Sequence, residues 1–156
     1  MMLWCLVFAI VGADQLTKAL VLSKLMTEGE SIAYGSFFNL TLVYNRGISF
    51  GFLAMPQPWG AWVLTGLTSI ITIGLMVWLV RIKGCVMRMS LSLVIGGAIG
   101  NLIDRIRFGH VVDFLDIHYD HFHWPAFNVA DSMICVGVIL LIWSQMKVQK
   151  SEEHHV

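Results

Sequence analysis

The segment WGAWVLTGLTSIITIGLMVWLV, residues 59–80, contains no charged side chain and is apolar almost throughout. An α-helix rises about 1.5 Å per residue, so about 20 apolar residues are enough to cross the roughly 30 Å hydrocarbon core of a bilayer. This segment therefore predicts a membrane-spanning helix.

The composition of the whole chain also indicates a protein that lies in a lipid bilayer. Hydrophobic residues make up 57% of the 156 residues and charged residues only 13%, whereas soluble domains average about 45–50% and about 25%. The formal net charge is zero, which argues against the basic face of a nucleic-acid-binding protein. The cysteines, Cys5, Cys85 and Cys135, are scattered without CxxC spacing, so we interpret them as small apolar side chains rather than a disulfide framework.

Three further segments are long and apolar enough to span a membrane, at about residues 2–25, 87–103 and 128–146. The first has no basic residue before Lys18 and no A-x-A cleavage pattern after it, so we expect a retained helix rather than a cleaved signal peptide. The predicted fold class is an all-α membrane protein. It is one polytopic domain, residues 1–156, built as a four-helix bundle with a small β-rich extracytoplasmic segment between the first two helices.

The short loop between the second and third spans carries Arg81, Lys83 and Arg88. Positive charge in short loops marks the cytoplasmic side, so both termini are expected in the cytoplasm and the longer segments, 27–58 and 104–127, outside. Within the first outer segment, SIAYGSFFNLTLVYNRGISFGFL (31–53) alternates loosely between apolar and polar residues. This pattern predicts a few short strands at the membrane surface.

Two ionisable residues, Asp14 and Lys18, lie inside the first predicted helix. Burying a charge in a bilayer is costly, so such residues normally face the protein and have a partner. Their spacing of four places them on one helix face and predicts a salt bridge; a catalytic or proton-relay role is the alternative. In the third helix, Gly96 and Gly100 have the spacing that lets another helix approach closely.

Asp113 follows the outer end of the third predicted helix, and Asp131 lies at the outer start of the fourth. Each aspartate, taken alone, could have a purely structural role. Asp131 would suit the first turn of a helix that Asn128 caps. Asp113 would suit a position on the protein surface. Because both lie at the same membrane face, we expect them to meet. Two close carboxylates share a proton, so one acts as base while the other polarises a carbonyl. This division of labour suits peptide hydrolysis.

Five blocks carry a family resemblance: DQLTK (14–18), NRGISF (45–50), GGAIGNLIDR (96–105), VVDF (111–114) and FNVAD (127–131). They resemble, in order, the signature blocks of the lipoprotein signal peptidases, the bacterial signal peptidase II family. The resemblance implies an aspartyl endopeptidase of the bacterial cytoplasmic (inner) membrane. Such enzymes remove the signal peptide from diacylglyceryl-modified prolipoproteins by cleaving before the lipidated cysteine at the outer face.

By motif match, the resemblance implies that Asp113 and Asp131 are the catalytic pair. It also implies a set of residues that bind substrate or support the site: Asn45, Gly47, Asn101, Asp104, Arg105, Asn128, Asp14 and Lys18. The family needs no metal or other cofactor, acts among membrane lipids and is inhibited by the cyclic peptide globomycin; a monomer suffices for its chemistry. We further expect the loop at 45–58, with its Gly47, Gly51 and Pro56-Gln57-Pro58 sequence, to close over substrate.

Two other functions compete with this interpretation. The run DIHYDHFH (116–123) contains Asp116, His118, Asp120, His121 and His123, which invites a zinc site and a membrane metallopeptidase. No HExxH or similar motif supports that site. The other candidate is a small transporter or channel subunit whose Asp14–Lys18 pair lines a path, but the charges gather at one face and the chain lacks repeated halves.

Overall fold

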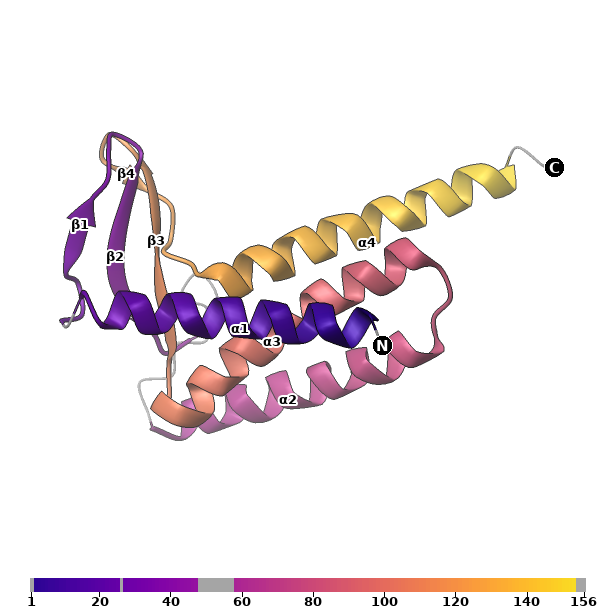
Figure 1. Ribbon diagram of the computed structural model, residues 1–156, viewed down its shortest axis with the longest axis horizontal. Helices are drawn as coiled ribbons and strands as arrows, with labels where there is room; N and C mark the ends of the chain where they lie inside the picture. The colour runs from indigo at the N-terminus through magenta and orange to yellow at the C-terminus, as the bar shows by residue number, and fades with distance from the viewer. Residues whose placement is uncertain (1, 26, 48–57, 154–156) are drawn as a thin grey trace.

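The structure is a computed structural model that describes residues 2–25, 27–47 and 58–153. Four helices run along a common direction, with a small sheet at one end (Figure 1). They are α1 (Met2–Leu22), α2 (Pro58–Arg81), α3 (Cys85–Phe108) and α4 (Val129–Glu153). All four are long and apolar enough to cross a membrane, so the structure contains the four helices of this kind that the sequence predicts.

The helix ends differ from the predicted ends in a way that matters for the site. Helix α3 continues past Ile103 to Phe108, because a helix does not have to end where its apolar run ends. It stops at Gly109, whose φ of 75° is left-handed and whose N–H donates to the Arg105 carbonyl over 3.0 Å. Glycine adopts this conformation without steric cost, and it is the common end of a helix.

The sheet has four antiparallel strands in the order β1-β2-β3-β4. Strands β1 (Ser31–Ala33) and β2 (Phe38–Asn45) lie between α1 and α2, where short strands were predicted. The all-α class and the confinement of the strands to this segment are wrong, however, because β3 (Val111–Tyr119) and β4 (Phe122–His123) follow α3. Residues 111–114 of β3 are buried on both faces, so the strand lacks the alternation that identifies a half-exposed strand in sequence.

An apolar cluster attaches the sheet to the end of α1. Val21 and Leu25 pack with Leu42 of β2 and with Val112 and Phe114 of β3. This contact holds β3, and therefore Asp113, at a set height above the helices. The sheet is thus part of the framework of the site rather than a separate surface feature.

Helix α3 occupies the centre of the bundle and contacts the other three helices. Its glycines permit this close packing, as the Gly96–Gly100 spacing predicts. A side chain at Gly97 would collide with the carbonyl oxygen of Ala130 in α4. A Cβ at Gly100 would lie 2.6 Å from Asp14 Oδ2 in α1. Close approach therefore brings the polar residues of α1, α3 and α4 together at one level.

Candidate active site

Asp131 lies in the first turn of α4 and forms a reciprocal cap with Asn128. The Asp131 N–H donates to Asn128 Oδ1 over 2.9 Å, and the Asn128 N–H donates to Asp131 Oδ2 over 3.3 Å. Both groups satisfy backbone donors at the helix start, as in a capping box. The prediction that Asn128 caps this helix and that Asp131 suits its start is therefore confirmed. The other carboxylate oxygen of Asp131, Oδ1, is free of the cap and contacts another residue.

Asp113 lies on β3, where its side chain is 1% exposed. The antiparallel pairing with β2 places Val43 opposite Asp113 and Asn45 opposite Val111. Asn45 Nδ2 donates to Asp113 Oδ2 over 3.0 Å, and Asn128 Nδ2 donates to Asp113 Oδ1 over 2.7 Å. The alternative explanation of Asp113 as a surface acid is thus wrong, because Asp113 is a buried carboxyl group held by two amides.

Two asparagines connect the carboxyl groups of Asp113 and Asp131. Asn101 Nδ2 donates to Asp131 Oδ1 over 2.7 Å, and Asn101 Oδ1 accepts a 3.0 Å hydrogen bond from Asn128 Nδ2. Since Asn128 also donates to Asp113, four side chains from β3, α3, α4 and the residue before α4 form one connected network. The structure thus brings the two aspartates into a single polar site at the sheet end of the bundle.

The Asp14–Lys18 salt bridge predicted from the sequence is confirmed, and a third charged group joins it. Lys18 Nζ lies 2.8 Å from Asp14 Oδ2 and 2.8 Å from Asp104 Oδ2. All three side chains are at most 3% exposed. Lys18 also donates to Asn101 Oδ1 over 3.0 Å. Because this contact makes Oδ1 the acceptor, the Asn101 amide must turn its N–H₂ toward Asp131.

The carboxylates of this triad also tie the other elements together. Asp14 Oδ1 accepts the N–H of Ala130 in α4 over 3.0 Å, and Asp104 Oδ2 accepts the N–H of Val112 in β3 over 3.1 Å. These bonds reach the residues that directly precede Asp131 and Asp113. The three charged residues therefore fix the backbone next to the two aspartates, and we call Asp14, Lys18 and Asp104 the supporting triad.

Gln15 also contacts this triad, and the sequence analysis did not identify it. Its Nε2 donates to Asp104 Oδ1 over 2.9 Å, to the Gly100 carbonyl over 3.2 Å and to Asp14 Oδ2 over 3.3 Å. Its place beside Asp14 in an apolar helix was the available signal, because a polar amide there needs partners inside the protein.

Gly47 and Arg105 connect the end of β2 to α3. Arg105 Nη2 donates to the Gly47 carbonyl over 3.3 Å, and the Gly47 N–H donates to Asn45 Oδ1 over 3.0 Å. The second bond orients the Asn45 amide so that its N–H₂ faces Asp113. Most of the loop predicted to close over substrate, 45–58, lies outside the described residues.

Burial, and to a smaller extent the charge of nearby Asp131, raise the pKa of Asp113 to about 7. Hydrogen bonds from Asn45 and Asn128, and the more distant Lys18 charge, act in the opposite direction. A carboxyl group with such a pKa exists in both protonation states near neutral pH, which suits a group that gives and takes a proton.

The His- and Asp-containing run at 116–123 does not form the zinc site considered from the sequence. His123 Nδ1 lies 2.9 Å from Asp116 Oδ1, and the His118 ring stacks on His123 with 4.9 Å between centroids. Asn39 and Thr41 also donate to Asp116. Among the described residues, no three His, Cys, Asp or Glu side chains are placed to hold a metal ion. The geometry does not favour the metallopeptidase.

Four helices able to span a membrane, with the carboxyl groups of Asp113 and Asp131 joined through asparagines at one end, define the class: a polytopic membrane protein with a polar site at the ends of its helices. A family profile described as "Signal peptidase (SPase) II" matches residues 6–147. The chain belongs to this signal peptidase II family of aspartic peptidases. The resemblance seen in the five sequence blocks is confirmed.

Individual relatives agree with the family match. The chain is 45% identical over 143 residues to a lipoprotein signal peptidase of Janthinobacterium sp. (strain Marseille), covering 88% of this chain and 84% of that protein. It is 48% identical over 136 residues to a lipoprotein signal peptidase of Burkholderia mallei (strain SAVP1), covering 86% and 81%. It also resembles a solved bacterial membrane enzyme with a TM-score of 0.79 and 32% identity, covering 96% and 90% of the chains.

Proposed function

We propose that this enzyme removes the signal peptide from diacylglyceryl-modified prolipoproteins, cutting before the lipidated cysteine, with Asp113 and Asp131 as the catalytic pair. The observation that carries this proposal is the network in which Asn128 and Asn101 join the two carboxyl groups at the end of the spanning helices. A lipid-modified peptide reaches that level by moving laterally through the bilayer. The relatives named as lipoprotein signal peptidases support the same substrate class.

In the proposed reaction, ionised Asp131 takes a proton from water as the hydroxide attacks the scissile carbonyl carbon. Protonated Asp113 donates its proton to the carbonyl oxygen. When the tetrahedral intermediate collapses, the C–N bond breaks and the leaving amine takes the proton from Asp131, while the hydroxyl proton on the former carbonyl oxygen returns to Asp113. One water is consumed, and both aspartates regain their starting states.

The roles follow from the surroundings of each carboxyl group. Asp131 accepts hydrogen bonds from the Asn101 amide and the Asn128 backbone and lies in the first turn of α4, where the helix dipole favours a negative charge. Asp113 has a pKa raised to about 7, which favours the neutral acid below that pH. Asn45, Asn101 and Asn128 supply amide groups at the site, and Arg105 anchors the Gly47 segment beside it; an extended substrate backbone would be oriented by these groups.

The proposed location is the bacterial inner membrane, with the site at the outer face and both termini in the cytoplasm. Arg81, Lys83 and Arg88 around the α2–α3 connection support this orientation, because such charges mark the cytoplasmic side. The catalytic network belongs to one chain, so we propose that a monomer is sufficient, that no cofactor is needed and that globomycin inhibits the enzyme.

The proposal is tested with the purified full-length enzyme and a diacylglyceryl-modified prolipoprotein. We expect mass spectrometry to locate the new N-terminus at the lipidated cysteine, with cleavage unaffected by a chelator and blocked by globomycin. The same precursor without its diacylglyceryl group is the control and should remain uncut. Loss of activity with the chelator would contradict the aspartyl mechanism, and equal cleavage of the control would contradict the substrate class.

The pH dependence of cleavage depends on Asp113 and its partner Asn45. If Asp113 is the acid, kcat/KM falls as the pH rises through about 7. Asn45→Ala removes a donor that stabilises ionised Asp113, so the Asp113 pKa rises and this alkaline limb moves to higher pH. The observed limb belongs to the coupled pair rather than to one residue, but the direction of the shift is unaffected.

Asn39→Ala is a matched control for this measurement. Asn39 lies on the same strand and also donates to a carboxylate, but its partner is Asp116 at 3.2 Å. We expect pH profiles of cleavage for this variant to overlay those of the wild type. An alkaline limb that stays in place or moves to lower pH in Asn45→Ala would show that Asp113 is not the acid.

A further inference from the structure

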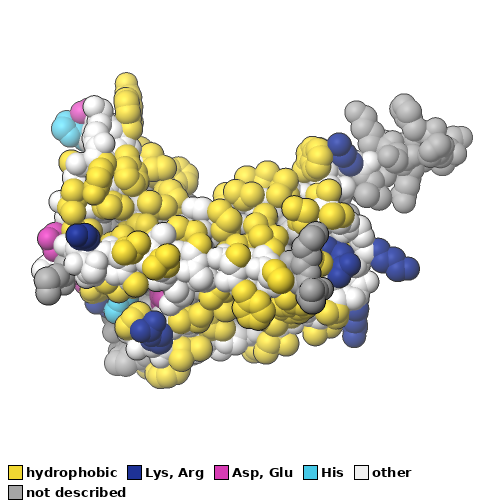
Figure 2. All heavy atoms as spheres, viewed as in Figure 1, with side chains coloured by type: hydrophobic (Ala, Val, Ile, Leu, Met, Phe, Trp, Pro, Cys, Tyr) yellow, Lys and Arg dark blue, Asp and Glu magenta, His cyan; other side chains and the backbone are white. Residues whose placement is uncertain are grey.

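The side-chain amide of Gln15 points into the bundle, although the proposed reaction gives it no chemical step. Figure 2 shows mainly hydrophobic side chains along the helical part of the molecule, with Lys and Arg side chains toward its two ends. An amide directed at lipid along that surface would find no hydrogen-bond partner. The Gln15 amide is instead directed from α1 at α3, where it donates to the Gly100 carbonyl and to Asp104.

The supporting triad lacks one donor, because it contains two carboxylates and one lysine. The ammonium group of Lys18 can donate three hydrogen bonds, and its partners are Asp14, Asp104 and Asn101. In this arrangement Asp104 Oδ1 receives no hydrogen from the lysine. Gln15 Nε2 donates to that oxygen over 2.9 Å. Within the described residues, Gln15 is the donor on which Asp104 Oδ1 depends.

The other carboxylate oxygen of Asp104 faces the strand that carries Asp113. Asp104 Oδ2 accepts the Val112 N–H over 3.1 Å and lies 2.8 Å from Lys18 Nζ. Because Gln15 holds Oδ1 while Val112 and Lys18 share Oδ2, the carboxylate plane has one favoured orientation. Val112 directly precedes Asp113 on β3. The orientation of the Asp104 carboxylate therefore helps to fix the backbone from which the Asp113 side chain extends.

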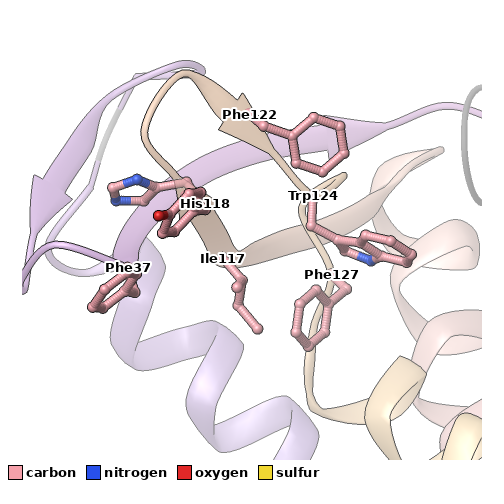
Figure 3. A pocket seen from close by; sticks show the side chains of 7 residues that line it. Phe37, Ile117, His118, Phe122, Trp124 and Phe127 are labelled. Atoms are coloured by element: carbon pink, nitrogen blue, oxygen red, sulfur yellow. The ribbon is translucent and has the colours of Figure 1, made fainter.

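The far end of β3 is held by contacts of a different kind. Figure 3 shows Ile117, Trp124 and Phe127 around an apolar hollow beside this part of the strand. Apolar contacts are non-directional, so they can hold a strand in place without fixing where one side chain points. A hydrogen bond weakens steeply as its angle departs from linearity. The bond between the Val112 N–H and Asp104 is therefore better suited to fix the direction of Asp113.

We propose that Gln15 is a positioning residue for Asp113, and that it acts through the Asp104 carboxylate and the Val112 N–H. This inference rests on the proposed function, because it assumes that the Asp113 carboxyl group must meet the scissile carbonyl. Among the described residues, the Gln15 amide donates to the supporting triad and to one α3 carbonyl. Its loss should therefore lower turnover rather than substrate binding.

A purely structural role is the alternative for Gln15. The same amide donates to the Gly100 carbonyl over 3.2 Å and to Asp14 Oδ2 over 3.3 Å, and the first of these bonds joins α1 to α3. If this were its whole role, loss of the amide would lower the amount of folded enzyme, and each folded molecule would still cut at the normal rate. If Gln15 positions Asp113, the folded molecules themselves turn over more slowly.

Gln15→Met separates these two roles, because it removes the amide and keeps most of the side-chain volume. The full-length enzyme is assayed with a diacylglyceryl-modified prolipoprotein, and the rate is divided by the concentration of folded protein. We expect kcat to fall about 10- to 100-fold, since a misplacement of about 1 Å can cost about 10²-fold in rate. KM should change little.

Thr17→Val is the matched control. Thr17 is a half-buried polar residue of the same helix, close to Gln15 in sequence. Its hydroxyl donates to the carbonyls of Ala13 and Asp14 over 2.9 and 2.8 Å, so its hydrogen bonds stay within α1. We expect kcat and KM of this variant to remain close to those of the wild type.

A double-mutant cycle tests whether Gln15 acts through Asp104. Asp104→Asn alters the group that Gln15 holds, so Gln15→Met should lower kcat much less in this background than in the wild-type enzyme. Equal losses of kcat in the two backgrounds would show that the residues act independently.

Gln15→Glu adds a readout that depends on pH. The introduced carboxyl group can donate a hydrogen bond to Asp104 only while it is neutral. Once ionised, it adds a charge beside the carboxylates of Asp14 and Asp104, which already share Lys18. The ratio of kcat for this variant to kcat for the wild type should therefore rise as the pH falls, whereas the same ratio for Gln15→Met should stay constant.

Hydrogen exchange of the Val112 amide, followed by NMR in the isotope-labelled full-length protein, requires no cleavage. It should be faster in Gln15→Met than in the wild type and unchanged in Thr17→Val. If the wild-type enzyme does not cut the prolipoprotein, the proposed function fails, while the exchange still decides whether Gln15 holds the Val112 contact. Wild-type exchange at Val112 in Gln15→Met, or a normal kcat per folded molecule, would overturn the positioning role.

Discussion

Asp113→Asn and Asp131→Asn are each expected to lower kcat/KM for signal-peptide cleavage by about 10²- to 10⁴-fold, the usual contribution of a positioned acid or base. Asparagine keeps the shape of the side chain but can neither take a proton from water nor give one to a carbonyl. In the proposed reaction the two groups act on the same water and the same carbonyl, so the double variant should be little worse than either single variant. Single-turnover cleavage of the lipid-modified precursor measures all three.

Asp116→Asn is the matched control for the catalytic pair. Asp116 lies on the same strand as Asp113, is 6% exposed and accepts hydrogen bonds from Asn39, Thr41 and His123. It is a buried, hydrogen-bonded aspartate outside the network of Asn101 and Asn128. We expect it to retain near-normal cleavage. A large loss in Asp116→Asn, or near-normal activity in either Asp113→Asn or Asp131→Asn, would refute the assignment of the pair.

Lys18→Met is expected to destabilise the folded protein by about 3–5 kcal/mol, because it leaves two buried carboxylates facing each other without a cation. Asp14 and Asp104 are 0% and 1% exposed, and each lies 2.8 Å from Lys18 Nζ. Methionine keeps most of the volume and the apolar contacts of the lysine stem. Thermal unfolding in detergent measures the loss, and the cleavage assay should show a further loss of kcat because Asn101 no longer has its amide oriented.

Two comparison variants separate charge from packing in this experiment. Lys24→Met removes an exposed lysine in the turn after the same helix and should change stability by no more than about 0.5 kcal/mol. Combining Lys18→Met with Asp14→Asn and Asp104→Asn removes all three charges and should recover a large part of the lost stability. If the triple variant is as unstable as Lys18→Met alone, the triad is not held together by its charges.

Polar residues at this candidate site combine a structural role with the chemical role that we propose, which explains why each looked ordinary when considered alone. Asn128 caps α4, and it also donates to Asp113 and Asn101. Asp131 completes the same cap and accepts from Asn101. A helix start supplies backbone donors and a favourable dipole, so it can hold a carboxylate ionised while fixing its position.

The four spanning helices and the family were predictable from the amino-acid sequence because they depend on local properties. Apolar length decides whether a segment crosses a bilayer, and residues 59–80 meet that requirement without any tertiary contact. The Asp14–Lys18 pair was equally accessible, since a spacing of four places both side chains on one helix face. The five short blocks identified the family because they occur in order along one chain.

Other features depend on contacts between segments that are distant in sequence. Strand β3 has no local signature, because residues 111–114 are all buried, with Val112 and Phe114 packed against the end of α1. Asp104 was grouped with the supporting residues, yet its partner Lys18 comes from another helix and meets it only because Gly100 lets α1 approach α3. The orientation of the Asn101 amide likewise requires Lys18 and Asn128 together. Side-chain partners of this kind are set by the packing of whole elements, whereas membrane crossing is set by the solvent that each element meets.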